Sequence, residues 1–218
     1  MDNVMYRLVN NELWNRVVKT DTVAVLLGGS RRMQITDDRS DYDLVVLSVN
    51  RKDFKREIEY VKCEGKKVHW YTETADLVLH PEQDSYTLFL SGNQTWKFVK
   101  DEDFLYINEQ YRYILEEILQ NKEQISRKSA ELLSRNCQSL IVRTISNNAI
   151  AEKDYTKYLY HLCIASFVST GETISDEAKN YLLEIKRIRW QETTEASKNW
   201  CIGRLRILNA IYALSDNI

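Results

Sequence analysis

Two aspartates of this 218-residue chain have the type and spacing needed to hold a divalent metal ion. Asp41 and Asp43 are two positions apart and lead directly into the apolar segment Leu44–Val49. If this segment is a strand, side chains two apart point to the same face, so both carboxylates can be directed at one point. Carboxylate oxygens suit Mg²⁺ or Mn²⁺, and Mg²⁺ completes its ligand shell with water and substrate phosphates. We therefore predict that Asp41 and Asp43 bind one of these metals.

A second group of residues, upstream of the aspartates, is suited to phosphate binding. The sequence Gly28-Gly29-Ser30 ends the apolar segment Thr22–Leu27. Glycines let the backbone approach a phosphate closely, and backbone amides and the serine hydroxyl can donate hydrogen bonds to its oxygens. Arg31 or Arg32 could add positive charge. Each sequence alone is usually a turn or a solvated loop, but their fixed order between two apolar segments favours a nucleotide and metal site.

The order Gly29-Ser30, a gap, and Ser40-Asp41-Tyr42-Asp43 resembles the signature of the DNA polymerase β-like nucleotidyltransferase superfamily. A looser resemblance, to the RNA-repair-associated subgroup called RlaP, extends over most of the chain. The segments that carry this looser resemblance are Val68–Tyr71, Leu88–Asn93, Glu102–Tyr106, Lys157–Leu162 and Thr170–Glu172.

The resemblance implies transfer of a nucleoside monophosphate from an NTP to an acceptor hydroxyl, with release of pyrophosphate. It implies that Asp41 and Asp43 hold Mg²⁺ or Mn²⁺, and the subgroup makes an RNA end the expected acceptor. Transfer to a small molecule or a protein, and a nucleotide-binding module with little or no catalysis, are the alternatives. The residues expected to contact the nucleotide are Gly28, Gly29, Ser30, Arg31, Ser40 and Asn93.

Two-metal nucleotidyl transfer also needs a third carboxylate on the next strand, and this chain has none at the expected place. One face of the predicted strand Lys67–Tyr71 offers Lys67, His69 and Tyr71. His69 is a candidate base or metal ligand because imidazole titrates near neutrality, although an ordinary half-buried histidine is the alternative. Glu73 is the second candidate. If neither serves, we expect nucleotide binding without rapid catalysis, or a base taken from the acceptor.

The loop after Gly-Ser also departs from the superfamily pattern. Many relatives place a glycine shortly after the serine, whereas this chain has Met33-Gln34 there. Without that glycine we expect a stiffer loop and a weaker hold on phosphate.

Three further groups have weaker functional signals. Gly92-Asn93-Gln94 either borders the nucleotide or simply ends a helix. Lys157 and His161 are four positions apart, so they share one face of a helix and could contact phosphate. Lys186–Trp190 interleaves basic residues with an aromatic, as RNA-binding surfaces do, although a solvated helix end is the simpler interpretation.

The hydrophobic pattern predicts the elements that must position these residues. We expect an α+β core over residues 1–105, with a small mixed sheet and flanking helices, followed by an all-helical bundle over residues 106–218. The expected strands are Thr22–Leu27, Leu44–Val49 and Val68–Tyr71, the last preceded by a turn at Gly65-Lys66-Lys67. The expected helices are Val4–Val18, Pro81–Gly92, Tyr111–Leu119, Leu132–Ile145, Tyr155–Phe167 with Gly171 as its cap, a helix opening at Ser175, and Ala196–Leu214.

Composition limits the class of protein. With 30 basic and 32 acidic residues the chain is close to neutral, which argues against a protein that coats nucleic acid and makes any RNA contact local. The four cysteines are far apart and include no C-x-x-C pair, so we predict reduced thiols rather than disulfides or a zinc site. No apolar run is long enough to span a bilayer and no signal peptide is evident, so we predict a cytoplasmic protein without membrane contact. The sequence predicts no oligomeric state.

Overall fold

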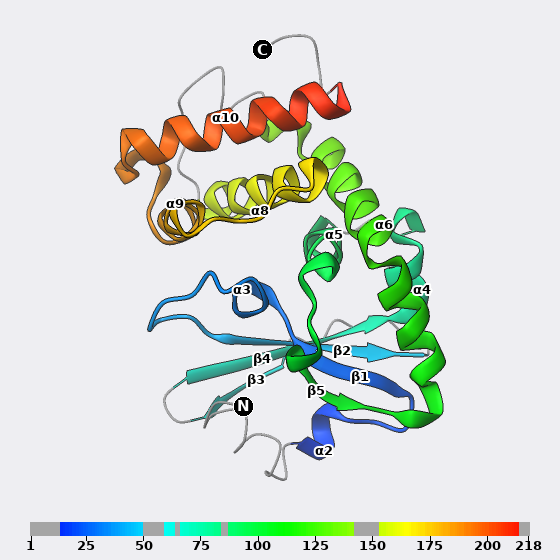
Figure 1. The fold of residues 1–218 in the computed structure, drawn as a ribbon. Coiled ribbons are helices and arrows are strands. Elements are labelled where there is room, and N and C mark those ends of the chain that lie inside the picture. The colour runs from blue at the N-terminus through cyan, green and yellow to red at the C-terminus, as the bar shows by residue number, and fades with distance from the viewer. Residues whose placement is uncertain (1–13, 50–58, 64–65, 84–86, 142–152, 214–218) are drawn as a thin grey trace. The chain divides into compact units, whose positions relative to one another are not determined.

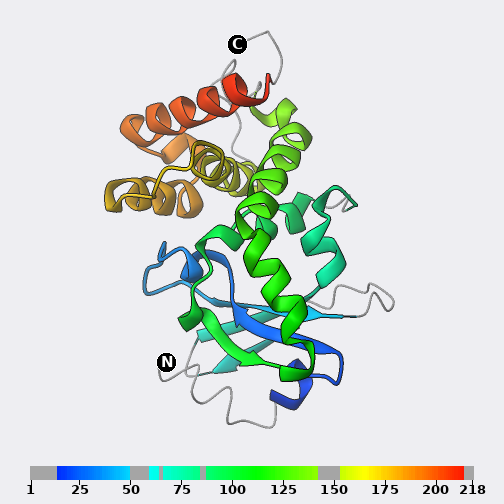
Figure 2. The same cartoon turned by 45° about the vertical axis from the view of Figure 1, so that its right-hand side comes forward.

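The computed structural model describes residues 14–49, 59–63, 66–83, 87–141 and 153–213. These residues belong to two compact units, one drawn from segments 1–83 and 98–125 and the other from segments 84–97 and 126–218. The boundary expected between residues 105 and 106 therefore falls inside the first unit. The first unit contains the sheet, and the second consists of helices and their connections (Figures 1 and 2).

A five-stranded mixed sheet, with strand order β3-β4-β2-β1-β5, forms the centre of the first unit. β2 runs parallel to β4, and the other neighbouring pairs are antiparallel. This sheet, followed by a helical C-terminal region, confirms the predicted α+β class. The strands are β1 (Thr22–Leu27), β2 (Tyr42–Ser48), β3 (Glu59–Cys63), β4 (Lys66–Thr74) and β5 (Phe104–Ile107).

The middle strands are continuous apolar runs because both of their faces are covered. β1 has the predicted bounds, and its residues 22–26 are all buried. Residues 44–47 of β2 are buried as well. A strand that is buried on both faces does not show the alternation of a half-exposed strand. Short helices at this sheet are α2 (Trp14–Val17), α3 (Gly29–Arg32) and α4 (Ala75–Leu79).

The two faces of the sheet are covered by different segments. On one face, Val17 of α2 packs in the same apolar cluster as Leu44 of β2. On the opposite face, Gly28 and the start of α3 lie against the backbone and side chain of Asp43. Figure 1 shows α2 and α3 on opposite sides of the sheet. The candidate site residues therefore belong to the face that α3 covers.

Some elements of the first unit differ from the sequence-based expectation. β2 begins at Tyr42, so Asp43 lies within the strand instead of just before it. β4 begins at Lys66, which is expected in a turn, because the antiparallel partner β3 pairs Lys62 with Lys67 and Cys63 with Lys66. The apolar pattern does not predict β3 or β5; β5 is four residues long and all four are only half-buried.

The helix expected to begin at Pro81 is also different. Pro81–Gln83 is a single 3₁₀ turn, and helix α5 (Thr87–Asn93) ends one residue after the predicted Gly92. Residues 4–13 of the expected N-terminal helix, and residues 142–145 of a later one, lie outside the described residues.

The helices after residue 110 agree with the prediction at their caps but not in their number. Arg112–Asn136 is one continuous helix, α6, where separate helices over Tyr111–Leu119 and Leu132–Ile145 are predicted, because small buried residues such as Ser129 and Ala130 continue its packed face. Gly171 has φ +77° directly after α8 and so acts as its cap. Ser175 Oγ accepts a hydrogen bond of 3.2 Å from the amide of Ala178, so Ser175 is the N-cap of α9, at the position where this helix is expected to open. Among the helices of the described ranges, none combines the length and apolarity needed to cross a membrane. These helices are α6 (Arg112–Asn136), α8 (Lys153–Thr170), α9 (Asp176–Arg187) and α10 (Glu195–Tyr212).

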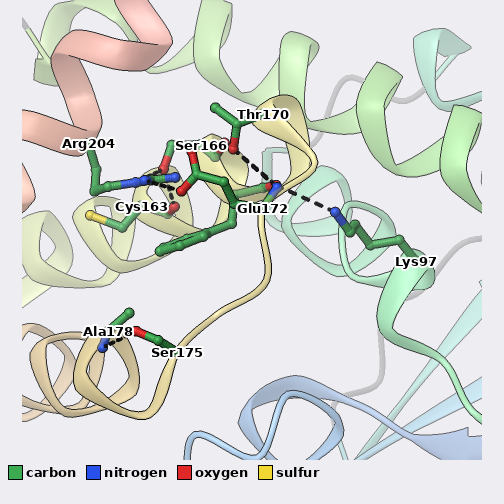
Figure 3. Close-up of polar contacts among 9 residues, drawn as sticks. Lys97, Cys163, Ser166, Thr170, Glu172, Ser175, Ala178 and Arg204 are labelled. Carbon is green, nitrogen blue, oxygen red and sulfur yellow. Dashed lines mark hydrogen bonds and ion pairs between the residues drawn. The ribbon is translucent and has the colours of Figure 1, made fainter.

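A buried arginine joins α10 to α8 and to the turn that follows α8 (Figure 3). Arg204 Nε donates to Ser166 Oγ at 2.6 Å, and Nη1 lies 2.8 Å from Glu172 Oε2. The guanidinium also lies 3.8 Å from the ring centroid of Phe167. This hydrogen bond from Arg204 holds the pKa of Glu172 below its usual value.

Three cysteines are described, and all three are buried free thiols, as the sequence predicts: Cys137, Cys163 and Cys201. The Sγ atoms of Cys163 and Cys201 are 3.5 Å apart. This contact and burial raise the pKa of Cys201, and burial raises the pKa of Cys137 to about 12, so these thiols are protonated and poor nucleophiles. The side chain of Cys63 lies outside the described part.

Candidate functional site

The parallel pairing of β2 with β4 sets which candidate residues lie side by side. Asp43 is opposite His69, and Leu47 is opposite Glu73. Directly opposed residues of neighbouring strands project to the same face, so these side chains lie on the face that α3 covers. His69 therefore occupies the place beside Asp43 where a third carboxylate is expected.

The two halves of the predicted motif touch at Gly29 and Asp43. The amide of Gly28 donates a 2.8 Å hydrogen bond to the carbonyl of Asp43. Gly29 has φ +55°, and a Cβ at this position would lie 2.2 Å from Asp43 Oδ2. Only a glycine allows this approach, because a side chain would have neither the backbone conformation nor the space. The turn and the carboxylate are therefore placed together by a contact that the sequence pattern alone does not reveal.

Asp41 lies just before β2 and is the more accessible of the two aspartates. Its side chain is 46% exposed, and its Oδ2 lies 3.7 Å from Nε2 of His69, which is 27% exposed. That distance is too long for a hydrogen bond but short enough for an ion pair when the imidazole is protonated. The Asp41 carboxylate and the His69 imidazole are thus within ion-pair distance at an accessible strand end.

The protein donors at this strand end do not form a closed metal cage. Within the described ranges, no three or more histidine, cysteine, aspartate or glutamate side chains are grouped so that they could hold a metal ion. Two carboxylates are nevertheless a suitable set for a Mg²⁺ ion that takes its other ligands from water and phosphate.

Arg31 and Ser40, both predicted to contact the nucleotide, shape the loop between α3 and β2. Arg31 Nη2 donates to the carbonyl of Ser40 at 2.9 Å, and its Nε donates to the carbonyl of Asp41 at 3.2 Å. Its guanidinium lies 3.5 Å from the ring centroid of Tyr42. The buried Ser40 Oγ donates to Asp37 Oδ1 at 3.1 Å and accepts from the amide of Asp37 at 3.0 Å. In this arrangement both side chains fix the backbone that carries Asp41.

The two arginines that follow Ser30 have different environments. Arg31 is partly exposed, whereas Arg32 is 4% exposed and its Nε donates to the carbonyl of Leu27 at 2.9 Å. Burial lowers the pKa of Arg32, while Tyr71, Asp103 and Glu73 act in the opposite direction. Sequence reasoning treated the two arginines as equivalent and overlooked Asp103, because a segment of three successive acids gives no sign that its third member is buried.

Glu73, the second candidate for the missing acid, is 1% exposed. It lies four residues beyond His69 on the same face of β4, and its charge is one of those that act on Arg32. Ser30 is also buried, and its carbonyl accepts a 2.8 Å hydrogen bond from the amide of Ile35.

The remaining candidates belong to the second unit. Asn93 and Gln94 are both fully buried, and Gln94 Nε2 donates to the carbonyl of His161 at 3.1 Å. The carbonyl of Gly92 accepts the Thr95 hydroxyl at 2.6 Å, so this segment has the hydrogen bonding of a helix end. A nucleotide contact of Asn93 stays a prediction.

His161 and the basic segment 186–190 are less suited to binding anions than their sequence suggests. Burial, together with the charges of Lys157 and Lys186, lowers the pKa of His161 to about 3, so this imidazole is neutral at physiological pH. Trp190 is only 2% exposed and contributes to the core. The interpretation of Lys186–Trp190 as a surface on which RNA bases stack is therefore wrong for its aromatic residue.

Comparison with known proteins gives a distant structural likeness. No protein-family model matches the chain, and no curated protein sequence matches it. A crystal structure of a nucleotidyltransferase-like protein from Exiguobacterium sibiricum aligns with 96% of this chain and 74% of its own, at 11% sequence identity and a TM-score of 0.39. A likeness of this size carries no conclusion about function.

Proposed function

We propose that the chain is a metal-dependent nucleotidyltransferase that moves a nucleoside monophosphate from an NTP to an acceptor hydroxyl and releases pyrophosphate. The observation that carries the proposal is the contact between Gly29 and the carboxylate of Asp43. It places a phosphate-binding type of turn against Asp43, one of the two carboxylates predicted to bind the metal. The order of these residues in the sequence supports the same activity through its resemblance to the polymerase β-like superfamily.

Asp41 and Asp43 would hold Mg²⁺ or Mn²⁺ together with the phosphates of the nucleotide. The donor set fits such an ion, because two hard oxygen ligands from one strand end leave positions for water and phosphate. When bound, the metal would stabilise the negative charge on the reacting phosphate. Gly29 carries no side chain of its own and has a left-handed backbone, and we assign its amide and Ser30 to the phosphates.

His69 is proposed to take the proton of the acceptor hydroxyl on Nε2. The support is its position directly opposite Asp43 and 3.7 Å from Asp41. A base at this place would act next to the metal-bound phosphate, as general base catalysis requires.

An RNA end is the acceptor we favour, and its support is the sequence resemblance to RlaP. The near-neutral charge of the chain and the burial of Trp190 mean that any RNA contact is small. A nucleotide-binding module without catalysis is the second candidate, because the neighbour of Asp43 on β4 is a histidine and not the third acid.

The test is transfer of label from NTPs labelled at the α-phosphate, with Mg²⁺ or Mn²⁺, to an RNA pool, a small-molecule extract or protein. Transfer that is lost in Asp41→Asn and Asp43→Asn but kept in Asp76→Asn, an exposed aspartate of α4, supports the enzyme. NTP binding without transfer to any acceptor favours the binding module. Failure to bind any NTP refutes both.

A further inference from the structure

A buried cation lies beneath the turn assigned to phosphate. Arg32 is the last residue of α3 and is 4% exposed. Its Nε donates to the carbonyl of Leu27, the residue that directly precedes Gly28. The arginine is therefore tied by a hydrogen bond to the chain just before the turn, and by the backbone to the chain just after it.

The Gly28-Gly29-Ser30 turn lies along one face of β2 and β4, and each of its glycines approaches a different part of these strands. Gly29 contacts Asp43, near the start of β2. Two residues further along β2, a Cβ on Gly28 would lie 2.9 Å from Val45 Cγ2 and 3.5 Å from the hydroxyl of Tyr71. Arg32 interacts with Tyr71 and Glu73, which lie further along β4. Gly28 and Gly29 allow the turn to approach the sheet, and Arg32 follows them at the end of α3.

The charges around Arg32 explain how a cation is tolerated there. Burial acts against the charged form of Arg32, and the groups that oppose this effect are Tyr71, Asp103 and Glu73. A buried charge is stable only when it is compensated, and the two carboxylates supply the opposite sign. Glu73 comes from β4, whereas Asp103 directly precedes β5, whose Phe104 pairs with Leu26 of β1. Carboxylates on both sides of β1 and β2 thus act on one guanidinium.

We propose that Arg32 is a positioning residue for the nucleotide site, with Glu73 and Asp103 as its counter-ions, and that Glu73 is not a metal ligand. Arg32 holds the turn in the position where Gly29 contacts Asp43. The amides at Gly29 and Ser30 are thereby aligned with the carboxylates of Asp41 and Asp43. This inference rests on the proposed function. It assigns to Glu73 a role different from that of the missing third acid.

An arginine is needed at this position because of the geometry of its donors. The guanidinium donates from Nε to the Leu27 carbonyl and carries further N–H donors in the same plane on its two other nitrogens. A lysine keeps the charge, but its single ammonium group cannot reproduce a planar set of donors. Arg32→Lys therefore separates the positioning role from the need for a compensating charge.

Two measurements on the full chain test the proposal. The first is the affinity for each of the four NTPs, titrated at several Mg²⁺ concentrations. Arg32→Lys and Glu73→Gln are each expected to weaken NTP binding by about 10–100-fold, the usual effect of losing a group that orients a ligand. The Mg²⁺ concentration for half-maximal binding should shift in Asp41→Asn and stay unchanged in Glu73→Gln. Arg39→Lys, on a side chain that is 75% exposed, is the matched control.

The second measurement is the urea midpoint of the two single variants and of Arg32→Lys/Glu73→Gln. Because both residues belong to one buried group, the urea midpoint of the double variant should fall by much less than the sum of the decreases in the two single variants. Asp103→Asn replaces Glu73→Gln in this cycle if the latter does not fold.

Each outcome has a defined meaning. Wild-type NTP affinity in Arg32→Lys overturns the positioning role. A Mg²⁺ shift in Glu73→Gln as large as that in Asp41→Asn shows that Glu73 is a metal ligand, and additive midpoints show that it is not the counter-ion. If the wild-type chain binds no NTP, the proposed function fails together with the positioning role, whereas the coupling in the urea cycle still decides the counter-ion assignment.

Discussion

Replacement of Gly29 by alanine is the most direct perturbation of the candidate site. Two separate effects can be worked out from the structure. The φ of +55° disfavours any side chain by about 1–2 kcal/mol. The new Cβ would also lie 2.2 Å from Asp43 Oδ2, whereas ordinary van der Waals contact begins at 3.4 Å. The turn and the carboxylate must therefore separate by about 1 Å, the scale at which packed interiors respond to an added methyl group.

A functional loss is expected in addition to the loss of stability. Oxygen ligands of Mg²⁺ lie at about 2.0–2.1 Å in near-octahedral geometry, so a carboxylate displaced by about 1 Å no longer binds. A misplacement of this size lowers a rate by about 100-fold, and we expect that loss in label transfer. The free energy of unfolding should fall by about 2–5 kcal/mol, the sum of the backbone effect and overpacking.

Two other glycines provide matched controls. Gly28 has φ −121°, a conformation open to any residue, and its Cβ would contact Val45 rather than the carboxylate. Gly28→Ala is therefore expected to lower stability with a smaller loss of transfer. Gly203, in α10, has nothing within 4 Å of its Cβ position, so Gly203→Ala should stabilise the chain by about 0.5–1 kcal/mol.

Urea unfolding and α-phosphate label transfer, measured on the same preparations, decide the matter. If Gly29→Ala has the stability and transfer rate of the wild type, then Asp43 is not held against the turn, and the reasoning about this site is refuted. Equal losses in Gly28→Ala and Gly29→Ala would show that general crowding, and not the Asp43 carboxylate, is responsible.

Two further predictions concern stability. Gln34, which stands near the position of a glycine in many relatives, has φ +57°, so Gln34→Gly should raise the free energy of unfolding by about 0.5–1 kcal/mol after the entropy of glycine is subtracted; a urea midpoint at or below that of the wild type contradicts this. The hydrogen bond from Arg204 lowers the pKa of Glu172 in the folded state from its usual value of 4.5. Its stabilisation is therefore complete above that unfolded-state pKa and is lost as the pH falls through the lower folded-state pKa. The urea midpoint of Glu172→Gln should lie below that of the wild type at pH 7 and converge with it toward pH 3, and a gap of constant size across this range would exclude the ionised hydrogen bond as its cause.

Local signals in the sequence were sufficient for much of the fold. The apolar run of β1 and the glycines after it define both the strand and its end, because burial on both faces leaves no alternation and glycine stops the strand. The ends of α8 and α9 follow from Gly171 and Ser175, since caps depend on residues that are neighbours in the chain. The shared face of Asp41 and Asp43 stays a prediction, because β2 begins at Tyr42 and contains only the second of them.

Tertiary structure decided the properties that depend on partners far away in the sequence. Arg31 and Arg32 are adjacent and chemically identical, yet only Arg32 is buried, where its Nε donates to the Leu27 carbonyl and the charges of Glu73 and Asp103 act on it. The parallel register of β2 and β4 places His69 beside Asp43 and leaves Glu73 four residue pairs away, which no local pattern specifies. Spacing therefore determined which residues could share a face, but the packing of α3 on the sheet determined which of them meet at the candidate site.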